Sequence, residues 1–309
     1  MTSIGGQALL EGIMMRGPKK SAMAVRDPDG NIVLEEFETP APKRAKFFKL
    51  PFVRGIFNFV DSMKLGYKCL MRSAEISGLE EIKEEVKEEQ EKKGKKGISG
   101  ELIMNAVMVV SALLGVLLAV GLFIYLPTQI FSWLTKPFPA INTNVWRGIF
   151  EGGLRLIIFV AYMLLMLLMK DIRRTFMYHG AEHKTIFCYE QGLELTVENV
   201  RKQKRFHPRC GTSFMILMII VGIIIGIFID ISNPFLRTLV KLLLLPLVMG
   251  IGYELIKLAG RKNNLLTRII SKPGVWMQHI TTIEPDDSMI ECAIAAMKAV
   301  IPDDDSDKW

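Results

Sequence analysis

One short segment, residues 178–184 with the sequence YHGAEHK, has the residue types and the spacing of a metal site. His179 and His183 are four residues apart, so on a helix they share a face and can hold one divalent ion. Glu182 lies between them, where a carboxylate would take a proton from metal-bound water. His-x-x-Glu-His is the inverted form of the zinc-protease helix signature. Because the chain has only four histidines, we interpret this spacing as a metal site. The alternative is a helix at the membrane interface with two solvated histidines.

A metal site needs three or four ligands, and His207 and Cys210 are the natural complement to the two helix histidines. Two residues separate them in the same loop, and both bind a borderline-soft ion such as zinc. All four ligands together would make a closed, structural site, whereas three of them with water would make an open one. The alternative interpretation of His207 and Cys210 is a sharp turn held by Pro208 and Gly211.

Glu254 is a rival third ligand. It follows His183 by 71 residues, which is near the separation at which the inverted zincins place their glutamate. It also lies about one turn inside the end of an apolar segment. We therefore keep it as a candidate ligand that faces the loop.

Four apolar segments are candidate membrane spans. Leu102 to Leu126 has 25 residues and Gly211 to Ile229 has 19, both without a charge, close to or above the roughly 20 residues that a bilayer requires. Two further segments are imperfect because they contain ionisable side chains: about 148–169, with Glu151 and Arg155, and about 234–258, with Lys241 and Glu254.

Charges inside spans are costly and by default indicate function, but here we expect simpler roles. Glu151 and Arg155 are four residues apart and can pair with each other on one helix. Lys241 can extend outward toward the headgroups. His279 is the only histidine outside the loop, and we interpret it as a surface or packing residue. A basic patch either holds a phosphate or anionic substrate or faces lipid headgroups; it comprises Arg201, Lys202, Lys204, Arg205 and Arg209.

Lysine and arginine counts predict the orientation. The part before the first span has 18, residues 170–212 have nine, and the tail from Lys257 has seven, whereas residues 127–147 have two. By the positive-inside rule both termini and the 170–212 loop are cytoplasmic. Residues 1–7 are uncharged, so we expect no signal peptide. The net charge of +7 is then explained by topology and lipid attraction, without a nucleic-acid partner.

The same topology places all four cysteines in cytoplasmic segments. We therefore expect reduced thiols, which are available as ligands but not as disulfides. The four are Cys69, Cys188, Cys210 and Cys292.

The segments outside the spans have mixed patterns. Residues 22–26 and 31–34 flank a turn signal, Asp-Pro-Asp-Gly, and predict a β-hairpin, after which Pro40 and Pro42 break the chain. Residues 47–73 predict an amphipathic helix that lies on the inner leaflet or packs against the spans. Residues 80–96, nearly all Glu and Lys, predict a solvated linker.

The later segments also predict short elements. The second span should continue as a helix to Gly180, and Thr196 should cap a helix over 197–204. Residues 275–283 predict a strand, and residues 284–288 should start a last helix that ends near Val300. We expect the Asp303 to Asp305 tail to be disordered.

Several motifs spread over the chain resemble those of the YqhQ-like family of bacterial membrane proteins, a family of unknown function sometimes labelled a predicted metal-dependent enzyme. The matching motifs are GGQA at 5–8, EG at 11–12, MMRG at 14–17, GAEHK at 180–184, HPRCGT at 207–212, TT at 281–282 and EP at 284–285. The resemblance implies a bacterial cell-membrane protein but brings no substrate or reaction.

These observations predict a mainly α membrane protein with about four transmembrane helices and a mixed α/β cytoplasmic layer. In chain order we expect a cytoplasmic β element, amphipathic helix and linker (1–101), two transmembrane helices (102–169), the His/Cys loop (170–212), two more transmembrane helices (213–258) and a cytoplasmic strand-helix tail (259–309).

The predicted function is that of an integral membrane metalloprotein with a cytoplasmic His/Cys site for a divalent metal, zinc being the expected ion. If the protein is an enzyme, Glu182 is the base of a hydrolase and the basic patch orients the substrate. The alternative is a non-enzymatic membrane scaffold, channel or transporter component whose His/Cys motifs are structural. Expected partners are membrane lipids, with a second copy or other membrane proteins as candidates.

Overall fold

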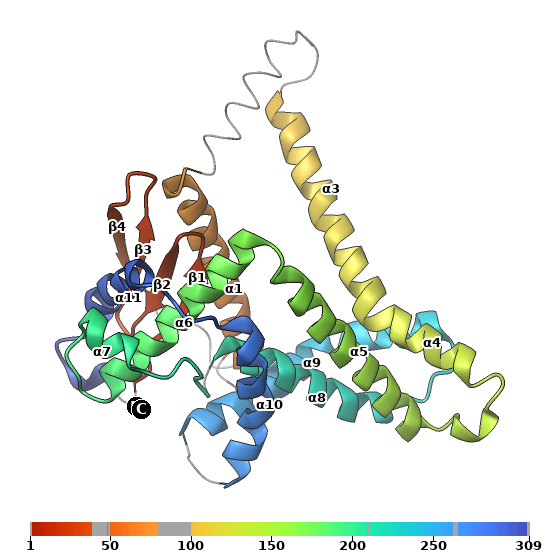
Figure 1. Cartoon of the computed structure of the whole chain (residues 1–309). Helices are drawn as coiled ribbons and strands as arrows, with labels where there is room; N and C mark the ends of the chain where they lie inside the picture. The colour runs from red at the N-terminus through yellow and green to blue at the C-terminus, as the bar shows by residue number, and fades with distance from the viewer. Residues whose placement is uncertain are drawn as a thin grey trace. The chain divides into compact units, whose positions relative to one another are not determined.

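The chain forms two compact units (Figure 1). The structure, a computed structural model, describes residues 2–38, 48, 50–78, 100–208, 210–261 and 265–307. The sheet unit combines Met1–Glu84, Met163–Leu217 and Tyr253–Trp309, and the apolar unit combines Glu85–Tyr162 and Met218–Gly252. The predicted linker over 80–96, the break at Pro40 and Pro42, and Arg209 of the basic patch lie outside the described residues.

A four-stranded antiparallel sheet forms the centre of the sheet unit, with its strands in sequence order. The strands are β1 (Gly5–Leu9), β2 (Gly12–Arg16), β3 (Lys20–Arg26) and β4 (Ile32–Glu38). The predicted hairpin is confirmed as β3 and β4, and Gly30 in its turn has a φ of +88°, which glycine adopts at little cost. Strands β1 and β2 come from the Gly- and Met-rich start of the predicted β element, a segment whose pattern does not identify individual strands.

Helices cover both faces of the sheet, and this explains why the pattern of the predicted β element does not show β1 and β2 as individual strands. Met14 and Met23 pack on the side of α1 (Val53–Ile76), whereas Ile13 and Met15 pack on the side of α6 (Lys170–Glu190) and α11 (Asp287–Val300). Successive side chains of a strand point to opposite faces. Because both faces are buried, the strands lack the alternation of apolar and polar residues by which a half-buried strand is recognised.

Helix α1 confirms the predicted amphipathic helix, although it begins at Val53. Its first turn packs closely on the end of α9 (Pro234–Arg261), because a Cβ at Gly55 would lie 2.7 Å from the Cβ of Tyr253. Asn58 also donates a hydrogen bond to the Tyr253 hydroxyl at 2.8 Å. Of the two predicted placements, packing against a candidate span therefore describes this end of α1.

Two helix boundaries differ from the prediction. Helix α5 (Asn144–Met166) ends before residue 170, and α6 then runs without a break through Gly180 to Glu190. The predicted end at Gly180 is therefore wrong. Gly180 is needed for close approach rather than for a break, because a Cβ there would lie 2.0 Å from the carbonyl oxygen of Ile283.

The predicted cap at Thr196 and the predicted start of the last helix within residues 284–288 are confirmed. Thr196 accepts a hydrogen bond from the backbone N–H of Asn199 and starts α7 (Val197–Arg201), which is shorter than expected. Asp286 accepts one from the backbone N–H of Met289 and starts α11. Such side-chain acceptors satisfy backbone donors that the first helical turn leaves without partners.

The predicted strand over 275–283 is wrong, because this segment belongs to helix α10 (Leu265–Thr281). Its buried positions include Thr267, Gly274, Met277, Gln278 and Thr281, a spacing of three, four and seven residues that is helical. Four of these five residues are small or polar. A search for apolar periodicity therefore misses the buried side of this helix.

The C-terminal tail packs on the sheet unit. This differs from the prediction that Asp303 to Asp305 are disordered. Asp307 is 4% exposed, and its carboxylate accepts hydrogen bonds from the Thr2 hydroxyl at 2.6 Å and the Tyr189 hydroxyl at 3.1 Å. Asp304 also pairs with Lys19. These contacts join the tail to Thr2, to Lys19 and to α6.

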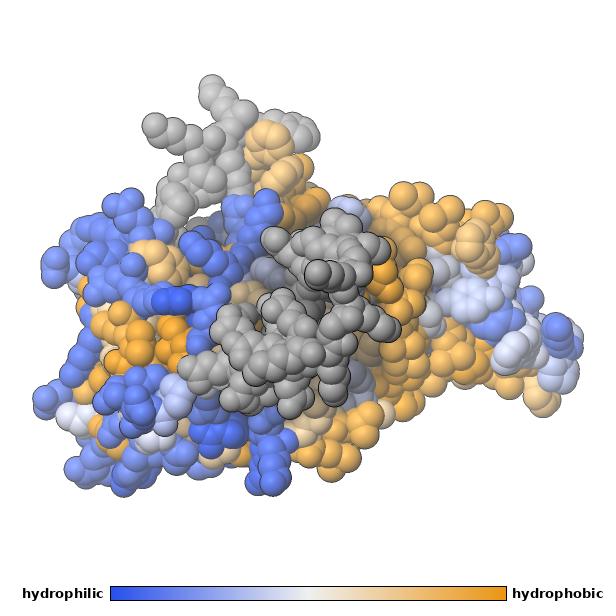
Figure 2. Space-filling view, turned by 90° about the horizontal axis from the view of Figure 1, so that it is seen from above, coloured by the Kyte–Doolittle hydropathy of each residue, from blue (hydrophilic) through white to orange (hydrophobic). Residues whose placement is uncertain are grey.

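Three helices of the described chain are long and apolar enough to cross a membrane: Val109–Leu134, Asn144–Met166 and Pro234–Leu258. The first combines part of α3 (Gly100–Val120), a π-helical turn, η2 (Gly121–Tyr125), and α4 (Leu126–Leu134), and a short 3-10 turn, η3 (Pro139–Ile141), follows it. The predicted third span forms α8 (Gly211–Ile227), an apolar helix of 17 residues. Hydrophobic side chains gather over the helices of the apolar unit (Figure 2).

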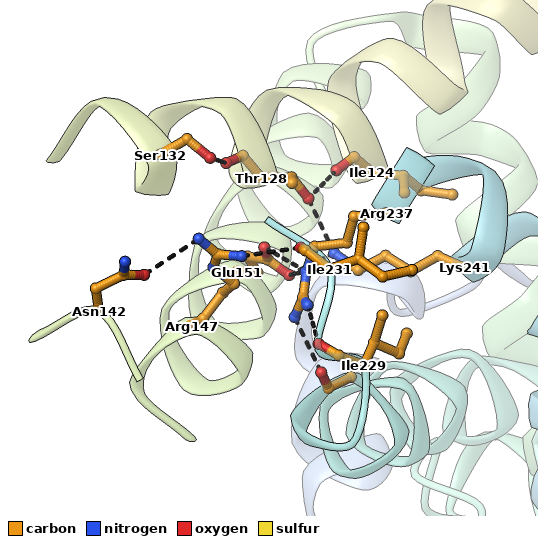
Figure 3. A network of polar contacts seen from close by, with 11 residues as sticks. Ile124, Thr128, Ser132, Asn142, Arg147, Glu151, Ile229, Ile231, Arg237 and Lys241 are labelled. Carbon is orange, nitrogen blue, oxygen red and sulfur yellow. Dashed lines mark hydrogen bonds and ion pairs between the residues drawn. The ribbon is translucent and has the colours of Figure 1, made fainter. Parts of the chain in front are cut away.

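A buried network of charged side chains links α5 and α9 within the apolar unit (Figure 3). Glu151 accepts hydrogen bonds from Arg237 Nε, at 3.1 Å, and from Lys241 Nζ. The predicted Glu151–Arg155 pair is therefore wrong, since Arg155 donates instead to the carbonyl of Phe123 at 2.8 Å. The prediction that Lys241 extends outward is wrong as well, because its ammonium also donates to Thr128 at 2.9 Å.

The same network caps the end of α8. Arg237 is fully buried and donates to the carbonyls of Gly226, at 2.9 Å, and Ile229. The carbonyl of Gly226 lies in the last turn of α8, where it also accepts a hydrogen bond of 3.3 Å from the N–H of Ile229, and a cation at a helix C-terminus is favourable. Arg147 makes the equivalent contact to the carbonyl of Ile231 at 3.0 Å. The network therefore supplies partners for backbone groups that an apolar environment cannot solvate.

We predict that Glu151→Met strongly destabilises the protein. The change leaves Arg237 and Lys241 buried without their shared carboxylate, and breaking a buried ion pair on one side costs about 3–5 kcal/mol. The melting temperature of the purified protein in detergent measures the effect. As a control, Glu198→Gln removes an exposed pair with Lys202 and should leave the melting temperature nearly unchanged. Equal melting temperatures for the two variants would contradict the prediction.

Candidate metal centre

Helix α6 carries the two motif histidines on one face, as their spacing predicts. The ring centroids of His179 and His183 are 4.4 Å apart. His183 is 1% exposed and His179 is partly buried. The alternative of two solvated histidines therefore does not describe this helix.

Each of these imidazoles is oriented by a backbone carbonyl. His179 Nδ1 lies 2.8 Å from the oxygen of Thr281, and His183 Nδ1 lies 2.5 Å from the oxygen of Arg205. A carbonyl only accepts, so both Nδ1 atoms carry a proton, and in the neutral form of each imidazole the lone pair is on Nε2. Metal-binding histidines are commonly held in this way by their second ring nitrogen. His183 Nε2 is buried and has no hydrogen-bond partner in the described part of the chain.

Cys210 is the third group at this point. Its Sγ lies 3.1 Å from His179 Nε2, and the Thr212 hydroxyl donates to it at 3.3 Å. The donor atoms of His179, His183 and Cys210 all lie within 4.8 Å of one another. Zinc bonds of about 2.0–2.3 Å place neighbouring donors roughly 3–4 Å apart, so small side-chain shifts would let these atoms surround one ion.

The charges of this cluster favour a thiolate. Burial alone raises the pKa of Cys210, but the nearby His179 and His183 hold it well below its usual value. Burial likewise opposes protonation of His179, yet the charge of Cys210 raises the pKa of this imidazole to about 9. The thiolate is the form in which cysteine binds metals.

Glu182 lies beside this cluster and is held by the N-terminal strand. It is 5% exposed and accepts a hydrogen bond from the backbone N–H of Gly6. Burial raises the pKa of its carboxyl group, and His179 and His183 oppose this shift. A Cβ at Gly6 would lie 2.9 Å from the Cδ of Glu182. The N-terminal glycine motif therefore lets β1 approach the carboxylate.

His207 and Glu254, the other predicted ligands, lie elsewhere. His207 is buried and its ring Nε2 is 3.7 Å from the carboxylate of Glu190. Its backbone N–H donates a hydrogen bond to the side-chain oxygen of Gln278. Glu254 forms a bidentate ion pair with Arg54, whose Nε and Nη2 donate to the two carboxylate oxygens at 2.7 and 2.5 Å. Among the described residues, these two are not part of the group of converging donor atoms.

Much of the predicted basic patch is engaged with carboxylates. Arg201 pairs with Asp287, Lys202 with Glu198, and Arg205 with Glu284 at 3.7 Å. His279 is exposed and stacks on Phe206 with a centroid distance of 4.4 Å.

Two kinds of contributor escaped the sequence analysis. The first comprises the backbone carbonyls of Thr281 and Arg205, which orient the histidines and which no side-chain pattern reveals. The second is Lys184, which is 3% exposed. Its ammonium donates hydrogen bonds to the carbonyl of Arg201, at 2.8 Å, and to the carboxylate of Glu284. Its place directly after His183 in the GAEHK motif was the only available signal.

The sheet between helices, the long apolar helices and the His/Cys cluster define a mainly helical protein with a candidate metal centre. The chain belongs to the family described as "Protein of unknown function (DUF1385)", whose model matches residues 50–303. It is 35% identical over 301 residues to the Bacillus subtilis (strain 168) protein named "Uncharacterized protein YqhQ", which covers 96% of this chain and 92% of the relative. The predicted YqhQ-like family is thus confirmed. No solved structure matches the chain.

We predict that the neighbouring glycines of β1 respond differently to substitution. Gly6→Ala should destabilise the protein by about 1–3 kcal/mol, because the added methyl group meets Glu182 and the carbonyl of Met14 at 2.9 and 2.8 Å. Gly5→Ala is the matched control, since a Cβ there has nothing within 4 Å. Thermal melting in detergent compares the two variants. Similar melting temperatures would mean that β1 does not press on Glu182.

Proposed function

We propose that this protein is an integral membrane metalloprotein whose cytoplasmic site holds zinc through His179, His183 and Cys210. One observation carries the proposal. Two imidazoles are each fixed at Nδ1 by a backbone carbonyl, His179 Nε2 lies 3.1 Å from the sulfur of Cys210, and one donor atom of each of His179, His183 and Cys210 lies within 4.8 Å of the others. His183 Nε2 is buried and has no hydrogen-bond partner among the described residues, which is costly unless something binds there.

The donor set fits zinc. Two imidazole nitrogens and one thiolate are ligands of borderline softness, and three protein ligands leave one position open, as in catalytic zinc sites. A bound ion would act as a Lewis acid and activate water.

Glu182 would be the proton acceptor of a hydrolase. Its carboxylate is buried next to both histidines and is positioned by the backbone of Gly6. Burial raises its pKa, and a carboxylate whose pKa moves toward neutrality is a better general base. The reaction class that follows is metal-assisted hydrolysis, with the substrate entering from the cytoplasmic side.

A structural site is the second candidate. The ring of His207 lies 5.7 Å, centroid to centroid, from that of His183, so a rotation of His207 away from Glu190 would bring a fourth ligand. Four protein ligands would close the site. The protein would then be a membrane scaffold, channel or transporter component in which the metal holds the cytoplasmic layer together.

For the topology, we propose four spans, with α8 as the short third one, and cytoplasmic termini. A 17-residue helix is at the lower limit for crossing a bilayer, and the uncharged residues that follow to Ile229 extend it. The distribution of Lys and Arg supports this orientation.

The metal content of purified variants tests the site. We expect about one zinc per wild-type chain and a sharp loss in His179→Ala, His183→Ala and Cys210→Ser. His279→Ala and Cys188→Ser are matched controls outside the cluster and should keep the metal. With cobalt in place of zinc, the wild type and both controls should show the thiolate-to-cobalt absorption band, and any cobalt that remains in Cys210→Ser should lack it. A wild-type protein that binds no zinc at micromolar concentration would refute the metal site.

Glu182→Gln separates the enzyme from the structural alternative. The amide keeps the size of the side chain but removes the base, so an enzyme should retain zinc and lose activity in a complementation assay. A structural site should tolerate the change. His207→Ala adds a second criterion, because only a closed four-ligand site should lose metal in this variant.

Reporter fusions test the topology. A fusion at Asn142 should read as external, because residues 127–147 contain only two cations, and fusions at Glu194 and at the C-terminus should read as cytoplasmic. A cytoplasmic signal at Asn142 would show that the first two apolar helices are not a pair of spans.

A further inference from the structure

Helix α10 has an outward face with a composition unusual for a surface exposed to water. Leu265, Ile269 and Trp276 on this helix are 75%, 59% and 60% exposed. We propose that this face lies in the headgroup layer of the cytoplasmic leaflet and binds anionic phospholipid through Arg268 and Lys272. The inference rests on the proposed membrane placement and not on the metal site.

The helical spacing gathers these side chains into one stripe. Residues 265, 269, 272 and 276 follow one another by four, three and four positions, which keeps them on a single face. The opposite face is buried and largely polar or small. Gln278, for example, is fully buried and exchanges two hydrogen bonds of 2.7 Å with the backbone of His207. The polar side of α10 is therefore turned inward and its apolar side outward.

A surface that combines exposed apolar and basic side chains fits a partner that offers both an apolar region and negative charge. Arg268 and Lys272 are exposed and lie on the same stripe as Leu265, Ile269 and Trp276. Basic side chains beside leucine, isoleucine and tryptophan are typical of helices that lie in the membrane interface. Tryptophan prefers the headgroup level, and each lysine or arginine attracts anionic lipid.

The chain itself brings α10 to this layer. The candidate span ends at Leu258, helix α9 ends at Arg261, and α10 begins at Leu265. Seven residues reach at most about 25 Å when fully extended, so the start of α10 cannot leave the neighbourhood of the membrane surface. This continuity favours lipid over a soluble partner.

The position of α10 would also link lipid to the candidate centre. The same helix ends at Thr281, whose carbonyl orients His179 at 2.8 Å. A lipid-bound stripe on the outward face would therefore fix the helix that holds one side of the site.

Fluorescence quenching by brominated lipids tests the proposal on the full-length protein in nanodiscs. Trp133→Phe, Trp146→Phe and Trp309→Phe together leave Trp276 as the single tryptophan. We expect its emission to be quenched more by lipid brominated near the headgroup than by lipid brominated deep in the chain. Brominated phosphatidylglycerol should quench it more than brominated phosphatidylcholine at the same mole fraction.

Charge variants separate anionic binding from simple insertion. Arg268→Gln with Lys272→Gln should abolish most of the preference for phosphatidylglycerol, by roughly fivefold per cation, and leave quenching by phosphatidylcholine. Lys19→Gln with Lys20→Gln, on exposed lysines of the sheet, removes the same charge and should keep the preference. If the single-tryptophan chain proves unstable, Trp276→Phe in the unchanged chain should lose the same shallow-quenched component.

Several outcomes would overturn the inference. Unquenched, water-like emission would place α10 in solvent, and unquenched but blue-shifted emission would indicate a protein cover such as a second copy. Equal quenching by both lipids would refute anionic binding. A companion chain that keeps only Trp133, in a candidate span, reports whether the protein is in the membrane at all. Quenching of Trp133 without quenching of Trp276 would refute the α10 proposal while leaving the membrane placement intact.

Discussion

The candidate centre depends on a close backbone crossing between α6 and the segment that joins α10 to α11. Gly180 has no side chain to hinder it, and a Cβ there would lie 2.0 Å from the carbonyl of Ile283. The N–H of Ile283 donates to the carbonyl of Phe176 at 2.9 Å. This contact fixes the end of α10 on α6, and it thereby brings the carbonyl of Thr281 to His179. Without it, the imidazole would have no fixed tautomer and no fixed direction.

The protein uses buried polar groups in two ways. Around Glu151, the cations Arg237 and Lys241 donate hydrogen bonds to carboxylate, hydroxyl or carbonyl oxygens. The charged groups of this network are therefore partnered within the protein, and their contacts join helices. Around Cys210, by contrast, both histidines are held at Nδ1 by a carbonyl, His179 Nε2 contacts the sulfur, and His183 Nε2 has no partner among the described residues. A fully partnered network mainly specifies structure. A converging set with a donor atom left over is arranged for a ligand.

The N-terminal motif shows how tertiary packing gives meaning to a segment that local rules do not interpret. Its glycines and methionines carry weak strand signals, yet they form two strands that are covered on both faces. Gly6 is placed where only a residue without a side chain admits Glu182. Helix α10 illustrates the same limit. Small and polar residues such as Gly274 and Gln278 form the buried side of this helix, so the apolar pattern of residues 275–283 predicted a strand instead.

The sequence by itself determined the features that depend on neighbours along the chain. These are the helical spacing of His179 and His183, the caps at Thr196 and Asp286, the hairpin with its glycine turn, and apolar segments of membrane-spanning length. Tertiary structure alone decided which of Cys210, His207 and Glu254 joins the two histidines, and which cations meet Glu151. His179 meets Cys210 across 31 residues and Thr281 across 102, and Glu151 meets Arg237 across 86. Local propensity and periodicity act within a few turns of helix or strand, whereas these pairings follow from how distant segments pack to bury their surfaces and satisfy their polar groups.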